Sequence, residues 1–183
     1  GLMAIAADTT TPGDILPPPH YSDEFLHWDS EDDRPPKKRA HTGWHVLAPG
    51  TAEGPLVGGN LDTLISQLAT PWIPPLDGAI LFIEAAFSSL SKIVRDLTVL
   101  EQAGAFKKIA GLIVGRPFCL SETTETELLT TLSATVKRFG LPAIGRVDIG
   151  HTTPILTMPI GVGARICADP SHPRITLMEA AVE

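Results

Sequence analysis

The sequence predicts a mixed α/β domain, and its central element is a short buried strand that ends in a carboxylate. Residues 80–83 are four consecutive apolar residues, Ile-Leu-Phe-Ile, and Glu84 follows them directly. Such a run after the turn residues Asp77 and Gly78 is typical of a strand that is buried on both faces. Strands and amphipathic helices alternate from there to residue 147, and short strands dominate afterwards. This order indicates an α/β or α+β fold.

The other elements follow from the apolar periodicity and from residues that start or end helices. Before the central strand, we expect a strand at 44–47 and a helix at 61–68 with Asn60 at its N-cap. After it, we expect helices at 88–103 and 122–139, and strands at 109–114, 143–147, 155–161, 162–168 and 174–178. Residues 20–42 form a long loop that carries aromatic side chains among charges, and such loops are usually functional or disordered.

Length and composition limit the classes of function. The chain has 183 residues, of which 43% are hydrophobic, enough for one domain with appendages. Its net charge of −7 argues against a nucleic-acid partner, because phosphate backbones attract the opposite charge. No apolar run approaches the ~20 residues that span a bilayer, so we expect no membrane partner. Cys119 and Cys167 lack metal or redox spacing, so we expect reduced thiols, a cytoplasmic location and no cofactor or metal.

Glu84 and His151 form the candidate catalytic pair. Open α/β sheets place ligands at the carboxyl ends of their strands, and a buried carboxylate there needs a partner. We expect that partner to be His151, which follows Gly150. Taken singly, His151 is more often a structural histidine, and Glu84 could instead pair with Lys92 or Arg95. The chain has no Gly-x-Ser-x-Gly elbow, so the pair looks like half of an active site.

Asn60 has two explanations. Gly58 and Gly59 precede it, which lets backbone amides approach a ligand closely at a helix N-terminus. Simple capping of the following helix accounts for the same residues.

Five motifs in a fixed order carry a resemblance to a known family. They are 57–61 (Val-Gly-Gly-Asn-Leu), 69–71 (Ala-Thr-Pro), 80–84 (Ile-Leu-Phe-Ile-Glu), 111–115 (Gly-Leu-Ile-Val-Gly), and Gly150-His151 together with 157–161 (Thr-Met-Pro-Ile-Gly). In order and spacing they resemble the C-terminal domain of the LD-carboxypeptidase family of serine peptidases, peptidase family S66. The resemblance runs from about Pro17 to the C-terminus.

This resemblance implies a swivelling β/β/α domain and a Ser-Glu-His catalytic triad. The positions that match the family's acid and base are Glu84 and His151, and the family's serine lies in a preceding flavodoxin-like domain. By the logic of such triads, the histidine moves the proton and the glutamate orients the imidazole. The serine has no counterpart here, since the candidates fall in or beside predicted helices: Ser66, Ser88, Ser89, Ser91 and Ser133. We therefore expect the chain alone to be inactive and to need an upstream nucleophile domain.

The resemblance also predicts how the chain is divided. Residues 1–16 are expected to be a remnant of an upstream helix and linker, 17–43 a substrate loop, and 44–183 the C-terminal LD-carboxypeptidase-like domain. The chain would then be a fragment of a two-domain protein. Because homodimers are common in the family, we expect a homodimer.

Two branches of the family suggest different substrates. LD-carboxypeptidases proper cut the bond before the terminal D-Ala of murein tetrapeptides, whereas the microcin C immunity branch cuts an amide that joins a terminal aspartate to a nucleotide. Residues 18–28, 152–154 and 157–161 look more like the second branch. We expect Trp28 to stack on the nucleobase, with Tyr21 or His20 opposite, and Asn60 to contact the substrate.

Two departures from the family pattern leave the substrate open. Ala85 follows Glu84 where the family usually has an acid, and the loop around Lys37 is unusual for the family. Two alternatives therefore stand beside the peptidyl-nucleotide hydrolase: a murein tetrapeptide carboxypeptidase, and a non-catalytic binding domain of the same fold.

Overall fold

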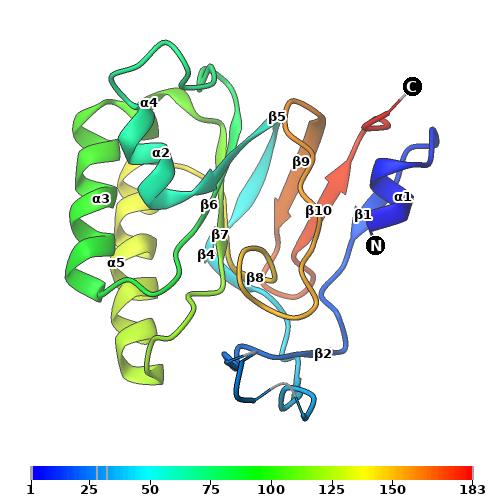
Figure 1. Cartoon of the computed structure of the whole chain (residues 1–183). Helices are drawn as coiled ribbons and strands as arrows, with labels where there is room; N and C mark the ends of the chain where they lie inside the picture. The colour runs from blue at the N-terminus through cyan, green and yellow to red at the C-terminus, as the bar shows by residue number, and fades with distance from the viewer. Residues whose placement is uncertain (1, 28, 32, 183) are drawn as a thin grey trace.

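The computed structural model describes residues 2–27, 29–31 and 33–182, and it shows a mixed sheet with most of its helices over one face (Figure 1). The helices are α1 (Leu2–Ala6), α2 (Leu61–Gln67), α3 (Leu90–Gln102), α4 (Ala105–Lys108) and α5 (Glu122–Phe139). The strands of the main sheet are β1 (Gly13–Ile15), β4 (His45–Ala48), β5 (Gly50–Asn60), β6 (Ile80–Glu84), β7 (Gly111–Gly115), β8 (Ala143–Val147), β9 (Gly163–Ala168) and β10 (Arg174–Leu177). A small separate sheet consists of β2 (His20–Tyr21) and β3 (Arg39–Ala40).

The main sheet has the order β1-β10-β9-β5-β6-β7-β8-β4. Strands β5, β6, β7 and β8 run parallel to one another, and all other pairs in the sheet, including β5 with β9 and β8 with β4, are antiparallel. Strand β5 joins the two parts, because its first half pairs with β9 and its second half pairs with β6. The parallel part therefore ends at a single edge, where the carboxyl ends of β5, β6, β7 and β8 meet.

The long strand β5 is absent from the sequence prediction. Its glycines and its proline are typical of a loop, and only the packing explains them. Gly58 has φ +146°, and a Cβ at this position would overlap the carbonyl oxygen of Phe82 on the neighbouring strand. The glycine lets two backbones approach closely just before the strand reaches Asn60.

Helices α3 and α5 cover one face of the parallel strands (Figure 1). Serines cap the two helices: the hydroxyls of Ser89 and Ser121 accept the amide hydrogens of Lys92 and Thr124. Gly140, at φ 68°, ends α5 in the left-handed conformation. The buried residues of this layer include Leu81, Ile83, Leu97, Leu100, Leu112, Val114, Leu128, Leu132 and Val136.

The opposite face of the parallel strands packs against β9 and β10, because the sheet folds over itself. Strand β9 contacts β4, β6 and β8 in addition to its sheet neighbours. A second buried cluster fills this layer and includes Leu56, Ile80, Phe82, Ile113, Ile144, Ile166, Ile175 and Leu177. Strand β6 is thus buried on both faces, as its apolar run predicts. The β/β/α layering confirms the predicted fold class.

Two segments differ from their expected roles. The predicted strand at 155–161 is wrong: this segment is a loop in the structure, in which Leu156 and Met158 pack against the core. Pro154 and Pro159 have no amide hydrogen to offer a strand ladder. Within 1–16, expected to be a helix remnant and linker, β1 pairs with β10 and joins the main sheet.

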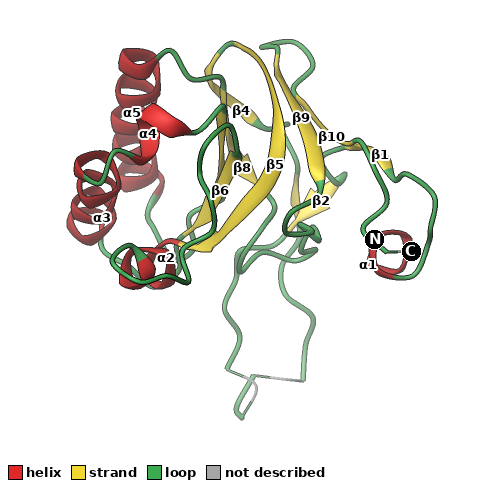
Figure 2. Ribbon diagram, turned by 90° about the horizontal axis from the view of Figure 1, so that it is seen from above, coloured by secondary structure: helices red, strands yellow, loops and turns green. Residues whose placement is uncertain are grey.

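The loop between β2 and β3 stands out from the body of the molecule (Figure 2). Its stem is the small sheet in which His20 pairs with Ala40 and Tyr21 with Arg39. None of the helices that the structure describes is long and apolar enough to cross a membrane.

Candidate active site

The site is built at the edge where the parallel strands end. Strand β5 ends at Asn60 and β6 at Glu84, and these two residues are direct partners in the register. His151 lies in the turn that follows β8. Parallel strands deliver their carboxyl ends to one edge, so three residues that are far apart in the chain meet there.

Glu84 and His151 are hydrogen-bonded. The Nδ1 atom of His151 lies 3.2 Å from Oε2 of Glu84, and the side chain of Asn60 donates from Nδ2 to Oε1 of the same carboxylate at 2.7 Å. The Glu84 side chain is 11% exposed, whereas that of His151 is 44% exposed. Both carboxylate oxygens are therefore engaged within a nearly buried site, and the imidazole faces outward.

Asn60 serves two contacts at once. Its Oδ1 accepts the amide hydrogen of Thr63 at 3.1 Å, which caps α2. Its Nδ2 holds the Glu84 carboxylate. The capping explanation is thus confirmed, and the same side chain fixes the acid of the pair. Contact of Asn60 with a substrate stays a prediction.

Two glycines allow the carboxylate to sit this close to its surroundings. Gly150 has φ +90°, and a Cβ there would lie 2.5 Å from Oε2 of Glu84. A Cβ on Gly115 would lie 2.9 Å from Cβ of Glu84. Any larger residue at either position would displace the side chain of the acid or the turn that carries His151.

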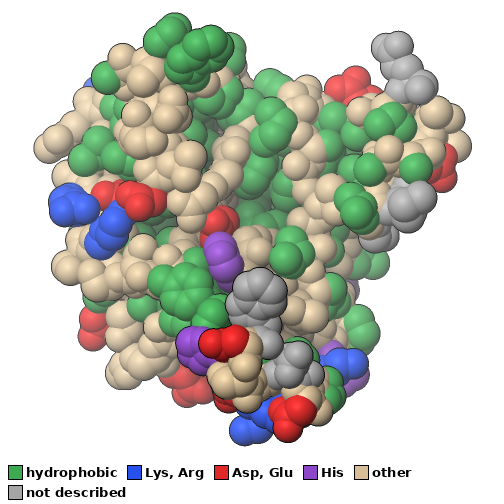
Figure 3. All heavy atoms as spheres, viewed as in Figure 1, with side chains coloured by type: hydrophobic (Ala, Val, Ile, Leu, Met, Phe, Trp, Pro, Cys, Tyr) green, Lys and Arg blue, Asp and Glu red, His purple; other side chains and the backbone are tan. Residues whose placement is uncertain are grey.

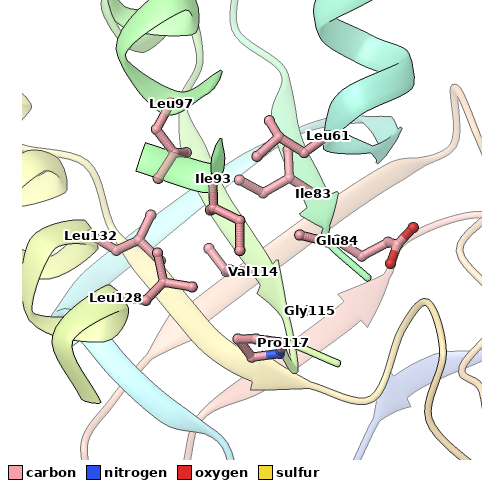
Figure 4. A pocket seen from close by; sticks show the side chains of 11 residues that line it. Leu61, Ile83, Glu84, Ile93, Leu97, Val114, Gly115, Pro117, Leu128 and Leu132 are labelled. Atoms are coloured by element: carbon pink, nitrogen blue, oxygen red, sulfur yellow. The ribbon is translucent and has the colours of Figure 1, made fainter. Parts of the chain in front are cut away.

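A small apolar pocket lies on the inner side of Glu84 (Figure 4). Side chains from α2, α3, α5, β6 and β7 line it, and the Glu84 carboxylate points away from it. Its volume of about 10 Å³ leaves room for no more than about one water molecule. The pocket reflects packing around the base of the acid, and it is too small to hold a ligand.

This arrangement can move a proton. A carboxylate accepts hydrogen bonds and cannot donate, so Nδ1 of His151 carries the hydrogen and Nε2 keeps a lone pair. Among the described residues, no serine, threonine or cysteine side chain is hydrogen-bonded to this imidazole. The hydroxyl of Ser88, next to Phe87, donates to the carbonyl of Ala86, and that of Ser133, on α5, donates to the carbonyl of Leu47.

Three phenylalanines surround the exposed imidazole. The rings of Phe87 and Phe118 lie 5.9 and 5.6 Å from that of His151, and Phe25 packs against both of them at 5.2 and 6.3 Å. Phe25 comes from the loop, whereas Phe87 and Phe118 follow β6 and β7. Our sequence analysis did not select Phe87 or Phe118 as site residues, although their positions just after two parallel strands could have indicated them.

Seen from the side of Figure 1, the surface is hollowed between the helix-covered part and the β9–β10 part, and hydrophobic side chains line the hollow (Figure 3).

The other predicted substrate residues lie in or near the loop. Tyr21 belongs to the stem, where the guanidinium of Arg116 covers its ring at 3.8 Å and His41 meets it edge-on at 5.5 Å. One ring face of Tyr21 is thus taken by the protein itself. His20 is exposed in β2. Trp28 lies outside the described residues, so its stacking role stays a prediction.

Comparison with known proteins gives a family and several relatives. Residues 53–166 match the family described as the LD-carboxypeptidase C-terminal domain. The Microcin C7 self-immunity protein MccF of Escherichia coli is 32% identical over 164 residues, which cover 87% of this chain and 47% of that protein. The putative carboxypeptidase YocD of Bacillus subtilis is 34% identical over 166 residues (90% and 50%). A probable murein peptide carboxypeptidase of Bacillus subtilis is 37% identical over 121 residues (64% and 38%).

Solved structures agree with these sequence relatives. An MccF-like protein from Bacillus anthracis superimposes with a TM-score of 0.79 at 29% identity, covering 91% of this chain and 51% of that one. MccF in complex with aspartyl sulfamoyl adenosine gives a TM-score of 0.78 at 28% identity (93% and 51%). The chain spans about half the length of the relatives it matches. With this match over most of its parallel sheet, the chain belongs to the LD-carboxypeptidase family, as a C-terminal domain.

Proposed function

We propose that this chain supplies the glutamate and histidine of a Ser-Glu-His triad in a serine carboxypeptidase or amidohydrolase of the microcin C immunity type. The observation that carries the proposal is the hydrogen bond between Glu84 and His151 at the edge where the parallel strands end. Membership of the carboxypeptidase family supports it. The serine comes from an upstream nucleophile domain, and the chain alone is inactive.

In this mechanism His151 carries the proton through the reaction. Its Nε2 accepts the proton from the serine hydroxyl while the serine oxygen bonds to the carbonyl carbon of the substrate. The same nitrogen then donates that proton to the departing amine as the amide bond breaks, and water repeats the sequence to release the acid. Glu84 holds Nδ1–H and stabilises the imidazolium, while Asn60 keeps the carboxylate in place.

The proposed substrate is a small peptidyl-nucleotide or aminoacyl-nucleotide with an amide to be cleaved. The similarity to MccF, which is known in complex with aspartyl sulfamoyl adenosine, supports this class. Trp28 of the loop would stack on the base. The phenylalanines at His151 offer further aromatic surface beside the reacting bond. A homodimer and a cytoplasmic location remain part of the proposal.

A second candidate substrate is a murein tetrapeptide. The probable murein peptide carboxypeptidase of Bacillus subtilis, 37% identical over 121 residues, favours it. The same Glu-His pair would serve this reaction, so the two candidates differ only in what the loop binds. A non-catalytic binding domain is disfavoured because Glu84 and His151 are both present and are hydrogen-bonded to each other.

The test is an assay of the protein that carries this chain together with its nucleophile domain. An aspartyl-nucleotide amide and a murein tetrapeptide are offered separately. We expect turnover of the first, and a loss of about 10³–10⁴-fold for Glu84→Gln and His151→Asn. Turnover of the tetrapeptide alone would select the second candidate.

Matched controls are available on the surface. Glu127→Gln and His172→Asn change the same residue types at exposed positions and should leave the rate unchanged. Full turnover in His151→Asn would reject the triad.

A further inference from the structure

A buried polar cluster lies beside the His151 turn. Asp148 has no exposed side-chain surface, and its Oδ2 accepts hydrogen bonds from Nε2 of His41 at 2.8 Å and from Nε1 of Trp44 at 3.0 Å. The side chain of Arg116 is 6% exposed, and its Nη2 lies 3.7 Å from the other carboxylate oxygen. Burying charges is costly unless they are paired and hydrogen-bonded. A cluster of this kind therefore calls for a role.

The hydrogen bonds define the state of His41. Its Nδ1 accepts the amide hydrogen of Gly43 at 2.9 Å, so Nδ1 carries no proton. The proton sits on Nε2, which donates it to Asp148. The neutral imidazole thereby links the backbone at the end of the loop to the turn after β8.

Residues at the two ends of the loop are hydrogen-bonded to the His151 turn, one before and one after the histidine. On one side His41, just after β3, bonds Asp148, which lies three residues before His151. On the other side Ser22, just after β2, forms a bridge with Thr153, two residues after His151. Its two backbone hydrogen bonds measure 2.8 and 2.9 Å.

Two further contacts tie the same parts together. The guanidinium of Arg116, just beyond β7, covers the ring of Tyr21 in the stem and also approaches Asp148. Phe25 of the loop packs on Phe87 and Phe118, the rings that flank His151. Loop, turn and imidazole therefore share one set of contacts.

We propose that Asp148, His41 and Arg116 are positioning residues that lock the loop and the His151 turn into one unit. This inference rests on the proposed catalytic role of His151. The cluster keeps the imidazole at Glu84 and the loop at a fixed place relative to it. The cluster does not contact either ring nitrogen of His151, so the effect of the cluster on His151 is transmitted through the turn.

Two substitutions of His41 distinguish loss of the hydrogen bond to Asp148 from a general loss of structure. Gln places an amide near the position of Nε2 and keeps the donor to Asp148, while losing the acceptor for Gly43. Asn places an oxygen near Nδ1 and keeps the acceptor for Gly43, while losing the donor to Asp148. Only the bond to Asp148 reaches the His151 turn, so the two variants should behave differently.

The first readout is amide hydrogen exchange of the 183-residue chain. In His41→Asn, the amides of Ser22 and Thr153 should exchange about tenfold faster or more, the factor expected for a lost bond to a charged group. In His41→Gln they should stay within about threefold of the wild-type rates. The amide of Leu112, bonded within the parallel sheet, is the internal reference and should not change.

The second readout is the imidazole signal of His151 in NMR spectra. Its chemical shift should change in His41→Asn and stay the same in His41→Gln. The proposal is overturned if Ser22 and Thr153 keep their exchange rates in His41→Asn. It is also overturned if the His151 signal stays fixed there, or if Leu112 exchanges faster by the same factor. Because neither readout uses turnover, an inactive wild-type protein would reject the proposed function and leave this test intact.

Discussion

The acid and the loop of this site are held by different means. Glu84 ends a strand that is buried on both faces, and its position follows from the register of β5, β6 and β7. The loop between β2 and β3 has only a two-residue stem, and surface ion pairs such as Glu24 with Arg34 join its exposed part. What fixes the loop is a few buried polar groups at its base. The acid is thus positioned by the sheet, and the proposed substrate loop by a small cluster that can be broken separately.

The largest effect should come from removing Asp148 from the buried cluster that it forms with His41 and Arg116. Asp148→Ala removes the acceptor of His41 and Trp44 and leaves the buried charge of Arg116 without its partner. The free energy of unfolding should fall by about 3–5 kcal/mol, as for other buried pairs that lose one member. Urea denaturation of the chain measures this.

Asp77→Ala is the control for that experiment, since Asp77 is exposed and its nearest cation lies 3.8 Å away. It should stay within about 0.5 kcal/mol of the wild type. Equal losses of unfolding free energy in both variants would show that the cluster contributes no more to stability than an exposed aspartate.

The next effect concerns the fit around the acid. Gly150→Ala would push a methyl group onto Oε2 of Glu84 and displace it from His151. We expect turnover of the whole protein to drop about 100-fold, as for a misplacement of about 1 Å.

Gly161→Ala separates this crowding from backbone strain. Gly161 has φ +84°, close to that of Gly150, but a Cβ there would meet nothing within 4 Å. Both variants should lose about 1–2 kcal/mol of stability from the left-handed backbone. In Gly150→Ala the crowding of Glu84 adds to this loss. If Gly161→Ala loses as much activity as Gly150→Ala, crowding of Glu84 is not the cause.

A smaller effect separates the two contacts of Asn60. Asn60→Asp keeps an oxygen that can cap α2, but it places a second carboxylate against Glu84. The melting temperature should change little, while turnover should fall about tenfold because a hydrogen bond becomes a repulsion. Asn60→Ser, a good cap that is too short to reach Glu84, is the companion variant. Unchanged turnover in both variants would show that Asn60 has no part in holding the Glu84 carboxylate.

The smallest effect lies in the exposed part of the loop. Hydrogen bonds from Arg34 and from the backbone amide of Lys37 lower the pKa of Glu24 to about 2 from its usual 4.5. Because the folded pKa is the lower one, the contact stabilises the loop above pH 4.5 and is lost as the pH falls toward 2. NMR titration of the Glu24 carboxyl should show this, while the global unfolding midpoint of Glu24→Gln stays near that of the wild type. A Glu24 that titrates near 4.5 would contradict the contact.

Sequence reasoning succeeded where local patterns decide the structure. Helix α5 and strand β8 have the predicted bounds, and strand β6 lies within its predicted stretch, because apolar runs and apolar periodicity mark them. It failed where packing overrides local preference. Strand β5 contains glycines that a neighbouring backbone requires, and residues 155–161 are apolar yet pack as a loop.

The site divides in the same way. Glu84 could be selected from its strand alone, whereas His151, 67 positions away, was one of several possible partners, and the family resemblance strengthened that choice. The contact between His41 and Asp148 spans 107 positions, and no local pattern marks it. Phe87 and Phe118 follow β6 and β7 closely, so the strand pattern could have indicated them, but their contacts with Phe25 and His151 depend on the fold.

The measurement that tests the Glu-His half-site most directly is the tautomer of His151, read from its ring nitrogens by NMR at about pH 8. A triad histidine must carry its hydrogen on Nδ1, facing the acid, and keep Nε2 free for the serine proton. We predict the Nδ1–H form in the wild type and a shift toward Nε2–H in Glu84→Ala. An imidazole that holds its hydrogen on Nε2 in both proteins would contradict the assignment of Glu84 and His151 as a catalytic pair.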